Sequence, residues 1–296
     1  MREAEVIELV DAFIAGAVTE ERWTHAAHVA SAAYLVRTRG RRRALSTMRD
    51  GIQNLNRVLG STGYHETLTV AWVDLLAGMV HEGRGEDAET MLRRVLAASA
   101  DKQVMLEHYT RDRVMSEEAR ARFVPPDLRP LPRPDYALRD ATPGDAERIN
   151  AIYNHYVPWS SCTFALEPTP IEERSLWLSR RHRDHPAVVA ETDGEVVGWG
   201  SLDPYRSRGG YAATAEISIY VDPSEHGRGL GRELTRRLMA RAAEVGLHTI
   251  IAMICTEQRA SLTAFSREGF VERGTMREVG RKLERWLDVA VLERRV

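Results

Sequence analysis

The sequence predicts an α+β fold in which an all-α domain is followed by a mixed α/β domain. The chain of 296 residues exceeds the size of one typical domain, about 100–200 residues. Five prolines lie within residues 124–136, helical spacing of apolar residues precedes them, and strand-like alternation appears only after them. We therefore expect a helical domain over residues 1–124, an extended linker over 125–135 and a second domain over 136–296.

Helical spacing identifies the elements of the first domain. Val6, Leu9, Val10 and Phe13 recur on one stripe, and Gly16 closes that run. Further helices are expected over residues 24–38, 42–58 and 64–76, after Gly85, after Asp101 and, as a last short helix, after the N-cap Ser116. No strand-like segment interrupts them, so the expected domain is all-α.

Alternating and β-branched segments identify the strands of the second domain. Strands are expected over residues 136–139, 187–192, 196–201, 215–221, 249–254 and 286–293, and the turn Asp193-Gly194 joins two of them as a hairpin. Helices are expected after the cap Thr142 and over residues 231–244 and 261–268.

Composition limits the classes of partner. The chain has 41 basic and 43 acidic residues, a net charge of −2, which gives no electrostatic footprint for nucleic acid or an acidic membrane. No run of about 18 apolar residues could span a bilayer, and the charged start lacks the apolar core of a signal peptide. The only cysteines, Cys162 and Cys255, suit a reducing compartment. We expect a cytoplasmic protein with neither nucleic acid nor membrane as partner.

A glycine-rich turn, His226-Gly227-Arg228-Gly229-Leu230-Gly231, stands between an expected strand and an expected helix. Glycines let the backbone approach a phosphate closely, and the N-terminus of the helix presents N–H groups and the positive end of its dipole. The pattern is typical of a pyrophosphate cradle, with a plain tight turn as the alternative. Its spacing matches neither the dinucleotide fingerprint nor the Walker loop.

Residues 136–296 resemble GNAT-family N-acetyltransferases, and within that family they are similar to the phosphinothricin and methionine sulfoximine acetyltransferases. The resemblance rests on IYNHYVPWSSCTFALEP (152–168), HPAVVAETDGEVVGWGSLDPYRSRGGY (185–211), AEISIYVDPSEHGRGLG (215–231), REGF (267–270) and GRKLERWLDV (280–289). It implies a central, mostly antiparallel sheet, acetyl-CoA as cosubstrate, a small-molecule amine as acceptor and a homodimer.

The resemblance also implies which residues hold acetyl-CoA. The family's turn begins with Gln or Arg, so His226 is a departure that we expect to weaken the phosphate contact modestly, because the cradle works through main-chain N–H groups. Arg228 and Arg232 are expected to pair with phosphate. The implied cofactor-binding residues are Ile219, Tyr220 and Val221 on the strand, His226, Gly227, Arg228, Gly229, Leu230, Gly231 and Arg232 at the turn, and Gln258 and Ser261 beyond it.

Acetylation of an amine requires a base, because an ammonium group has no lone pair with which to attack a thioester. Glu216 matches the glutamate of the subfamily's Ala-Glu-Ser motif and is the candidate; a solvated or ion-paired strand residue is the alternative. A main-chain N–H near Val221 is expected to stabilise the oxyanion. Many relatives have a tyrosine as general acid where this chain has Phe265, so Tyr220 and Tyr211 stay open as donors, as does an unassisted thiol.

Substrate recognition is expected to use charge. Arg206 and Arg208 correspond to a loop that faces the substrate in the relatives, and a guanidinium suits a carboxylate or phosphinate; a solvated pair of loop residues is the alternative. Tyr211 ends the same segment, and Phe164 aligns with a family aromatic near the substrate, with plain core as its alternative. Trp286 and Asp288 match a C-terminal Trp-x-Asp motif that we interpret as structural.

The helical half offers a second candidate site. Trp23-Thr24-His25-Ala26-Ala27-His28 places two histidines on one helix face, and His65 opens a later helix. The segment resembles an uncharacterised bacterial helical family with WTH-x-x-H and YHET motifs. His25, His28 and His65 are candidate ligands of a divalent transition metal; histidines that lock helix packing or line a small-molecule pocket are the alternative.

Three function classes follow from these patterns. The first is an N-acetyltransferase acting on a small amino acid or analogue by direct transfer in a ternary complex. The second is a bifunctional fusion whose helical domain has its own metal-dependent or metabolite-binding activity, and the third is a non-catalytic acyl-CoA sensor. Retention of Glu216 and of the three glycines favours catalysis over sensing.

Overall fold

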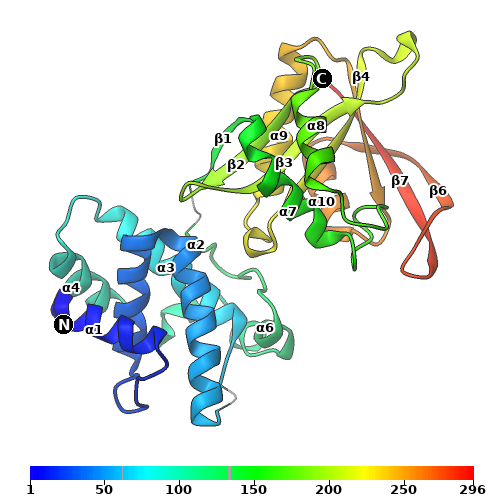
Figure 1. Cartoon of the computed structure of the whole chain (residues 1–296). Helices are drawn as coiled ribbons and strands as arrows, with labels where there is room; N and C mark the ends of the chain where they lie inside the picture. Colours follow the sequence, from blue (N-terminus) through cyan, green and yellow to red (C-terminus); the bar gives the residue numbers. More distant parts are fainter. Residues whose placement is uncertain (62, 133–134) are drawn as a thin grey trace. The chain divides into compact units, whose positions relative to one another are not determined.

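The computed structural model describes residues 1–61, 63–132 and 135–296, which form two compact units, Met1–Asp135 and Tyr136–Val296. The first unit is helical and the second is a sheet flanked by helices, which confirms the predicted fold class (Figure 1). Arg133 and Pro134, which belong to the expected linker, lie outside the described residues. Within the described ranges, no helix combines the length and apolar character needed to cross a membrane.

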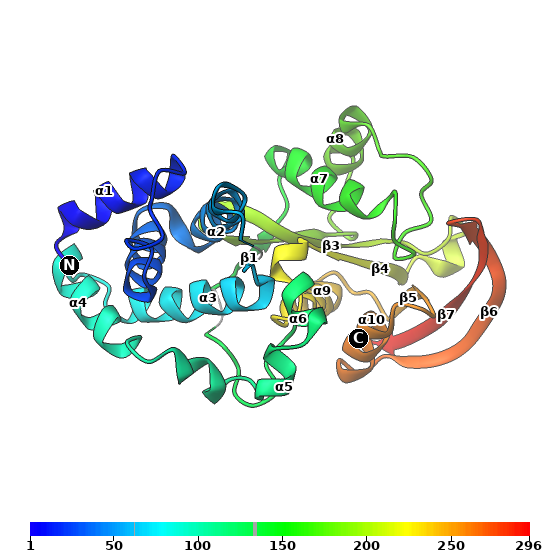
Figure 2. The same ribbon diagram turned by 90° about the horizontal axis from the view of Figure 1, so that it is seen from below.

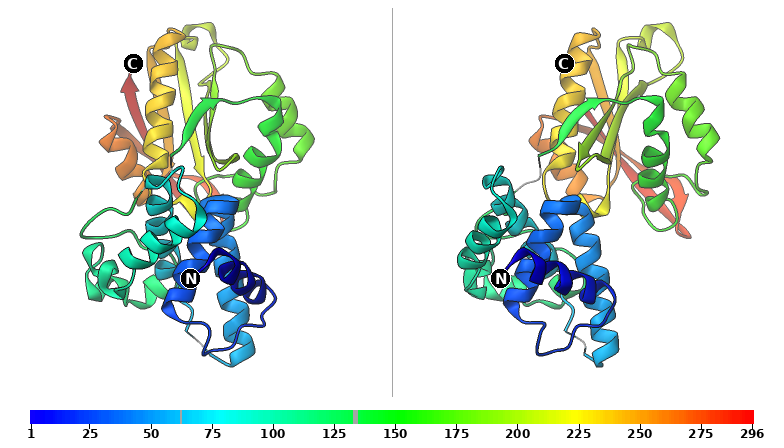
Figure 3. Two further views of the ribbon diagram at one scale, coloured as in Figure 1. Left: turned by 90° about the vertical axis from the view of Figure 1, so that its left-hand side faces the viewer. Right: turned by 60° about the vertical axis from the view of Figure 1, so that its left-hand side comes forward.

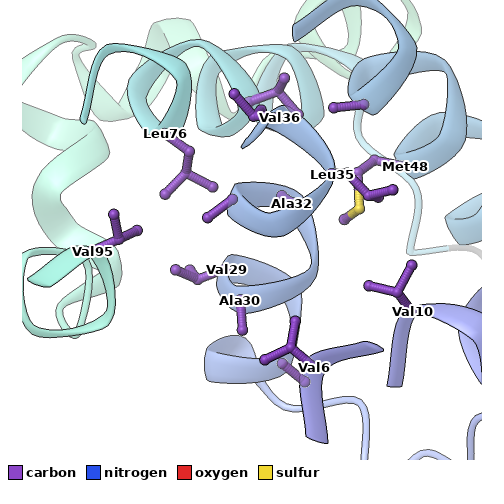
Figure 4. Close-up of a cluster of buried hydrophobic side chains, with 14 of the residues drawn as sticks. Val6, Val10, Val29, Ala30, Ala32, Leu35, Val36, Met48, Leu76 and Val95 are labelled. Carbon is purple, nitrogen blue, oxygen red and sulfur yellow. The ribbon is translucent and has the colours of Figure 1, made fainter. Parts of the chain in front are cut away.

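The helical unit is built on the apolar stripes that the sequence predicts. Its helices are α1 (Glu3–Ile14), α2 (His25–Leu59), α3 (Glu66–Glu82), α4 (Ala88–Ala98), α5 (Arg111–Val114) and α6 (Glu117–Ala121), with the 3-10 helix η1 (Lys102–Glu107) after α4. Val6 and Val10 of α1, Leu35 of α2 and Leu76 of α3 belong to one buried core (Figure 4). Burial of these stripes, more than helix propensity, holds such short helices together.

A kink at Gly40 explains the two helices expected over residues 24–38 and 42–58. The segment is one helix, α2, interrupted by the non-helical dihedrals of Gly40, φ 78° and ψ 162°. Directly after the kink, the buried Arg41 donates from Nε to Oδ1 of the buried Asp74 on α3 at 2.6 Å. The stretch after Asp101 differs from the expectation, since η1 is a 3-10 helix and α5 follows it.

Residues 125–132 pack against the helical unit, whereas the sequence predicts an extended linker over 125–135. Leu131 is buried, and a Cβ on Gly78 would come within 2.7 Å of Pro132. The N–H of Thr110 donates to Asp127 at 2.9 Å. Proline rings pack well on apolar surface even though they donate no hydrogen bond, so a proline-rich segment adheres without forming an element.

The second unit contains a seven-stranded sheet in the order β1-β2-β3-β4-β5-β7-β6. Only the β4–β5 pair is parallel. The strands are β1 (Ala137–Asp140), β2 (Ala187–Thr192), β3 (Glu195–Pro204), β4 (Thr214–Val221), β5 (Thr249–Cys255), β6 (Val271–Lys282) and β7 (Arg285–Arg295). The helices are α7 (Ala146–Tyr156), α8 (Ile171–Ser179), α9 (Leu230–Glu244) and α10 (Arg259–Arg267), with the 3-10 turns η2 (Pro143–Asp145), η3 (Gly209–Tyr211) and η4 (Pro223–Glu225).

Alternation along the strands gives the sheet two apolar faces. Val188 and Ala190 of β2 share a buried cluster with Leu234 of α9, whereas Val189 shares one with Ile149 of α7. Successive side chains of a strand point to opposite faces, so α9 and α10 cover one side and α7 and α8 the other (Figures 2 and 3).

Sequence patterns missed β6 and α8. Most residues of β6 are exposed, so this edge strand shows no alternation, and its turn to β7 uses Leu283 and Glu284 at positive φ, 52° and 62°, without a glycine. On α8 only Arg174 and Leu178 are buried, which leaves too short a stripe to detect.

Candidate functional site

The strands β4 and β5 diverge at the centre of the sheet. β4 pairs with β3 along its whole length but with β5 only from Thr214 to Glu216. Main-chain groups alternate in direction along a strand, and the N–H of Asp222 donates to Val197 on the β3 side at 2.8 Å. By that alternation Ile219 and Val221 turn their main-chain groups toward the gap between β4 and β5.

The same alternation turns the main chain of Tyr220 toward β3. Its side chain packs parallel to Trp199, with 4.9 Å between ring centroids. The expectation that Tyr220 presents its backbone to a cofactor therefore does not fit the strand geometry; Tyr220 supports the site through its ring.

The glycine-rich turn begins α9 without a capping side chain. Gly227 and Gly229 have φ of 75° and 84°, and Gly229 is the N-cap of α9. The N–H groups of the first turn of α9 consequently have no side-chain acceptor. A Cβ built on Gly231 would meet no atom within 4 Å, while the buried Leu230 anchors the turn in the core. The turn thus offers open space in front of main-chain donors, which fits a pyrophosphate.

His226, an exposed residue, is hydrogen-bonded at the start of the turn. Its Nε2 lies 2.6 Å from the hydroxyl of Tyr156 and 3.3 Å from the carbonyl oxygen of Val221, and Tyr156 also donates to that oxygen. Partial desolvation of the ring lowers the pKa of His226 below its usual value, which favours the neutral ring. His226 therefore ties α7 and the end of β4 to the turn, and we do not assign it a phosphate contact.

Arg228 and Arg232 are engaged with carboxylates. The buried Arg228 Nε lies 3.3 Å from Oε2 of the buried Glu225, which also accepts from Tyr136 at 2.7 Å. Arg232 donates to Glu268 at 2.8 Å. Arg228 is buried and paired with Glu225, which does not favour the expected contact with phosphate. Arg232 could contact phosphate only while it shares its charge with Glu268.

Gln258 and Ser261 lie at the start of α10, where Gln258 is the N-cap residue. The Nε2 of Gln258 donates to Ser161 Oγ at 2.9 Å. The buried Lys282 donates to the carbonyl oxygen of Thr163 at 2.7 Å, so residues 161–163 are fastened to α10 and β6. Phe164 follows directly and lies on Gly280, where a Cβ would come within 2.2 Å of its ring.

Glu216 is half-buried at the last position where β4 pairs with β5. Burial, and secondly the charge of Asp203 opposite it on β3, raise the pKa of its carboxyl group. Asp203 is held by Arg181 at 2.8 Å and by Ser201 Oγ at 2.6 Å. A carboxylate with a raised pKa at the point of divergence is suited to accept a proton.

The loop between β3 and β4 carries Arg206, Arg208 and Tyr211. The guanidinium of Arg206 lies 5.1 Å from the ring centroid of Tyr205 and 5.9 Å from that of Tyr211. No described carboxylate forms an ion pair with Arg206 or Arg208, and both side chains are exposed. Thr214, the first residue of β4 after this loop, lies two residues before Glu216. Two available guanidinium groups therefore stand close in the chain to the candidate base.

Arg174 was missed by the sequence patterns. This buried arginine of α8 lies 4.7 Å from the ring centroid of Tyr153 and 5.4 Å from that of Trp199, and it donates to Asn150 at 3.4 Å. Burial lowers the pKa of its guanidinium. Trp177, three residues further along α8, also contacts it at 5.1 Å, and this arginine–tryptophan spacing on one helix is a sequence signal that could have indicated the cluster.

The structure offers few proton donors for a leaving thiolate. Phe265 is buried edge-to-face against Phe270. Burial raises the pKa of Tyr220, which makes this phenol a poorer acid. Cys162 and Cys255 are free thiols, and burial raises the pKa of Cys162, so neither resembles an activated nucleophile.

The expected metal site is not formed by the described residues. They contain no group of three or more His, Cys, Asp or Glu side chains that could hold a metal ion. His65 uses both ring nitrogens, Nδ1 with the N–H of Leu68 at 3.2 Å and Nε2 with the carbonyl oxygen of Val114 at 2.8 Å. Nε2 of His25 contacts the carbonyl oxygen of Ser99 at 2.9 Å. The described residues therefore do not support the prediction of His25, His28 and His65 as ligands of one metal ion.

Trp286 and Asp288 have separate positions on β7. Trp286 is exposed, whereas Asp288 accepts from the N–H of Glu278 at 2.8 Å and so stabilises an irregular part of β6 at positive φ.

Known proteins resemble the second unit in sequence. The model of the acetyltransferase (GNAT) family matches residues 149–270. The L-amino acid N-acyltransferase MnaT of Escherichia coli (strain K12) is 35% identical over 158 residues, which are 53% of this chain and 92% of that protein. A phosphinothricin N-acetyltransferase of Streptomyces coelicolor is 38% identical over 162 residues, 53% of this chain and 94% of that protein.

Solved structures resemble the same portion of the chain. The acetyltransferase yncA of Salmonella typhimurium, determined with its cofactor acetyl-CoA, is 33% identical with a TM-score of 0.53 and covers 54% of this chain and 93% of its own. A GNAT superfamily phosphinothricin acetyltransferase from Sinorhizobium meliloti, in complex with AcCoA, is 32% identical with a TM-score of 0.53 and covers 54% of this chain and 88% of its own.

Proposed function

The chain belongs to the GNAT acetyltransferase family and is an acyl-CoA-dependent N-acetyltransferase, and we propose that its acceptor is the α-amino group of a small amino acid or amino acid analogue. The observation that carries the proposal is the half-buried Glu216 at the divergence of β4 and β5, three residues after the end of a loop with two available arginines. The names of the relatives, which act on L-amino acids, phosphinothricin and methionine sulfoximine, support the same acceptor class.

Acetyl-CoA supplies an activated acetyl thioester, and the gap beside β4 fits its arm. We assign the main-chain groups of Ile219 and the N–H of Val221 to the arm, because the carbonyl oxygen of Val221 already contacts Tyr156 and His226. We assign the N–H groups of Gly227, Gly229, Leu230 and Gly231 to the pyrophosphate. Arg232 is assigned a supporting charge, and Gln258 and Ser261 a place beside the cofactor. The open space beside Gly231 leaves room for the pyrophosphate next to these N–H groups, and this observation supports the assignment.

Glu216 is proposed as the general base. Its raised pKa makes the carboxylate a stronger base than an exposed glutamate, so in its deprotonated form it takes a proton from the ammonium group of the acceptor, directly or through water. A main-chain N–H near Val221 stabilises the oxyanion that forms during transfer. No dedicated acid is assigned, because the thiol of CoA has a pKa of about 8.5, near that of free cysteine.

Arg206 and Arg208 are proposed to bind the carboxylate or phosphinate of the acceptor, with Tyr211 and Phe164 as its apolar contacts. The rings of Tyr205 and Tyr211 lie beside the guanidinium of Arg206 and help to hold it, and the planar fork of N–H groups of a guanidinium matches the geometry of a carboxylate. A homodimer and a cytoplasmic location complete the proposal.

The test measures thiol release from acetyl-CoA with methionine sulfone, phosphinothricin and methionine, and with 3-(methylsulfonyl)propylamine, which lacks the carboxylate. We expect turnover with at least one amino acid and a higher KM for the amine. Arg206→Ala and Arg208→Ala should raise KM for the amino acid, whereas Arg273→Ala, on the edge strand β6, should not.

Glu216→Gln should lower kcat by about 10²- to 10⁴-fold, the usual contribution of a general base. Isothermal titration should still register acetyl-CoA binding to this variant. Absence of turnover on every amine with the wild-type chain would overturn the acceptor assignment, and undiminished kcat in Glu216→Gln would overturn the assignment of the base.

A further inference from the structure

A cavity of about 330 Å³ lies in the helical unit, in a region that the acetyltransferase proposal does not use. Its wall includes His28 of α2, Leu68 and Trp72 of α3, and Lys102 at the start of η1, together with Trp23 just before α2. The volume lies at the lower end of the range of small-molecule pockets, about 300–1,000 Å³.

Two tryptophans form rigid flat walls of the cavity. The ring of Trp23 stacks on the buried Phe13, with 4.2 Å between centroids and 14° between planes. Trp72 meets the ring of His25 edge-on at 5.0 Å. Because both rings are fixed by neighbours, the space between them suits a flat or branched apolar body without further ordering of side chains.

His28 places an unpaired polar atom at this wall. Its Nε2 is buried and has no hydrogen-bond partner among the described residues, while its ring lies 4.4 Å from that of Trp23. Burial lowers the pKa of His28 to about 4, so the ring is neutral at pH 7 and is able to exchange one hydrogen bond with a ligand. Leaving such a buried polar atom unpaired is unfavourable, and a ligand atom that pairs with Nε2 would remove that cost.

Lys102 adds a positive charge at the rim. No described carboxylate lines the cavity or forms an ion pair with Lys102. The neighbouring Asp101 is turned to the N–H of Gln103 at 2.8 Å, where it caps η1. The cavity therefore combines an apolar interior, one internal hydrogen-bonding atom and a cationic rim.

We propose that this cavity binds a small organic carboxylate with an aromatic or branched apolar body, with its carboxylate at Lys102 and its body between Trp23 and Trp72. The site is separate from the acyl-transfer site, and it gives the helical unit a ligand-binding role of its own. The proposal does not depend on which amine the second unit acetylates.

The experiment titrates the full chain with 3-phenylpropanoate and with its neutral isostere 3-phenylpropanamide in a calorimeter. We expect the acid to bind about tenfold more tightly than the amide, because only the acid carries a negative charge that pairs with Lys102. Lys102→Met should reduce the affinity for the acid to that for the amide. Arg93→Met, which removes an exposed cation of α4 outside the cavity, should change neither affinity.

His28→Leu tests the internal atom and should weaken both probes while the far-ultraviolet circular dichroism stays that of the wild type. Equal affinities for acid and amide, an unchanged affinity in Lys102→Met, or no heat with either probe at millimolar concentration would each overturn the proposal. Acetyl-CoA turnover by Lys102→Met should equal that of the wild type, so this result is independent of the acetyltransferase assignment.

Discussion

Glu216 shows how one position in the sheet sets the chemistry of a side chain. Thr214, Ala215 and Glu216 are flanked by β3 and β5, so the carboxyl of Glu216 is half-buried, yet the next residues of β4 face the gap. Its raised pKa comes from that burial and from Asp203. A glutamate exposed to solvent at a strand end would lack both the burial and the neighbouring carboxylate, so its pKa would not be raised in this way.

The pH profile should report this raised pKa. A general base acts when deprotonated, so kcat/KM should rise with pH through the pKa of Glu216, later than for an exposed glutamate. Asp203→Asn removes a like charge and should move the rise to lower pH, whereas Glu216→Gln should abolish it. Steady-state rates between pH 4.5 and 8 check this; an acid limb that persists unchanged in Glu216→Gln would contradict the assignment.

The glycine turn can be tested with a matched pair of substitutions. Gly229 and Gly246 have similar positive φ, 84° and 76°, at the two ends of α9, and a Cβ on Gly246 would meet nothing within 4 Å. Alanine at either position should cost about 1–2 kcal/mol of stability, because the left-handed region is unfavourable for a residue with a Cβ.

Only Gly229→Ala should also raise KM for acetyl-CoA, since Gly229 lies at the cradle and Gly246 does not. Thermal unfolding and initial rates measure the two effects separately. Equal KM values in the two variants would count against the turn as the pyrophosphate site.

The individual elements explain where sequence patterns succeed and where they do not. Runs of apolar residues, with glycines in the turns between them, locate β2, β3, β4 and α9. Both faces of those strands and one face of that helix are buried. The pattern is absent from β6, because most of its side chains face solvent. Its pairing with β7 depends on main-chain hydrogen bonds, which do not show in the sequence of side chains.

The connection from β1 to α7 should contribute stability that depends on pH. Arg139 contacts both oxygens of Asp145 at 2.8 Å, and Asp145 also accepts from Thr142, which lowers its pKa to about 2. Asp145→Asn should destabilise the second unit by about 1–2 kcal/mol at pH 7, a value discounted because Arg139 is partly exposed and water screens the pair.

The sign of the pH dependence follows from the lowered pKa. The stabilisation is complete above the unfolded pKa, about 3.9, and is lost as pH falls through the folded pKa. The difference in melting temperature between wild type and Asp145→Asn should therefore narrow between pH 4 and 2. Glu167→Gln, at an exposed carboxylate of the same unit, serves as control, and a constant difference across this range would argue against the ion pair as its cause.

At the scale of the whole molecule, the chain consists of two units with separate cores. Val6, Leu35 and Met91 belong to a cluster within the first unit, and Leu202, Leu234 and Ile250 to a cluster within the second. Relatives that match only 53% of this chain are covered over 92% or 94% of their own length. We therefore propose that residues 136–296 form an independent catalytic domain.

A fragment of residues 136–296 should fold and acetylate the same acceptor with kcat close to that of the full chain, because each unit buries its own apolar surface. Circular dichroism and thiol release compare the fragment with the full chain. A fragment that is folded but inactive would show that the helical unit contributes to catalysis, against this expectation.

The sequence by itself determined the fold class and the place of the glycine turn, because buried positions recur as apolar residues at regular spacing and positions with positive φ favour glycine. It also pointed to Glu216 through its motif. Only the tertiary structure decided which partners the side chains have. Arg228 forms an ion pair with Glu225, and His226 is hydrogen-bonded to Tyr156. Both ring nitrogens of His65 are hydrogen-bonded to main-chain atoms. Hydrogen-bond partners come from elements distant in the chain, so spacing along the sequence cannot reveal whether a charged or coordinating group is already engaged.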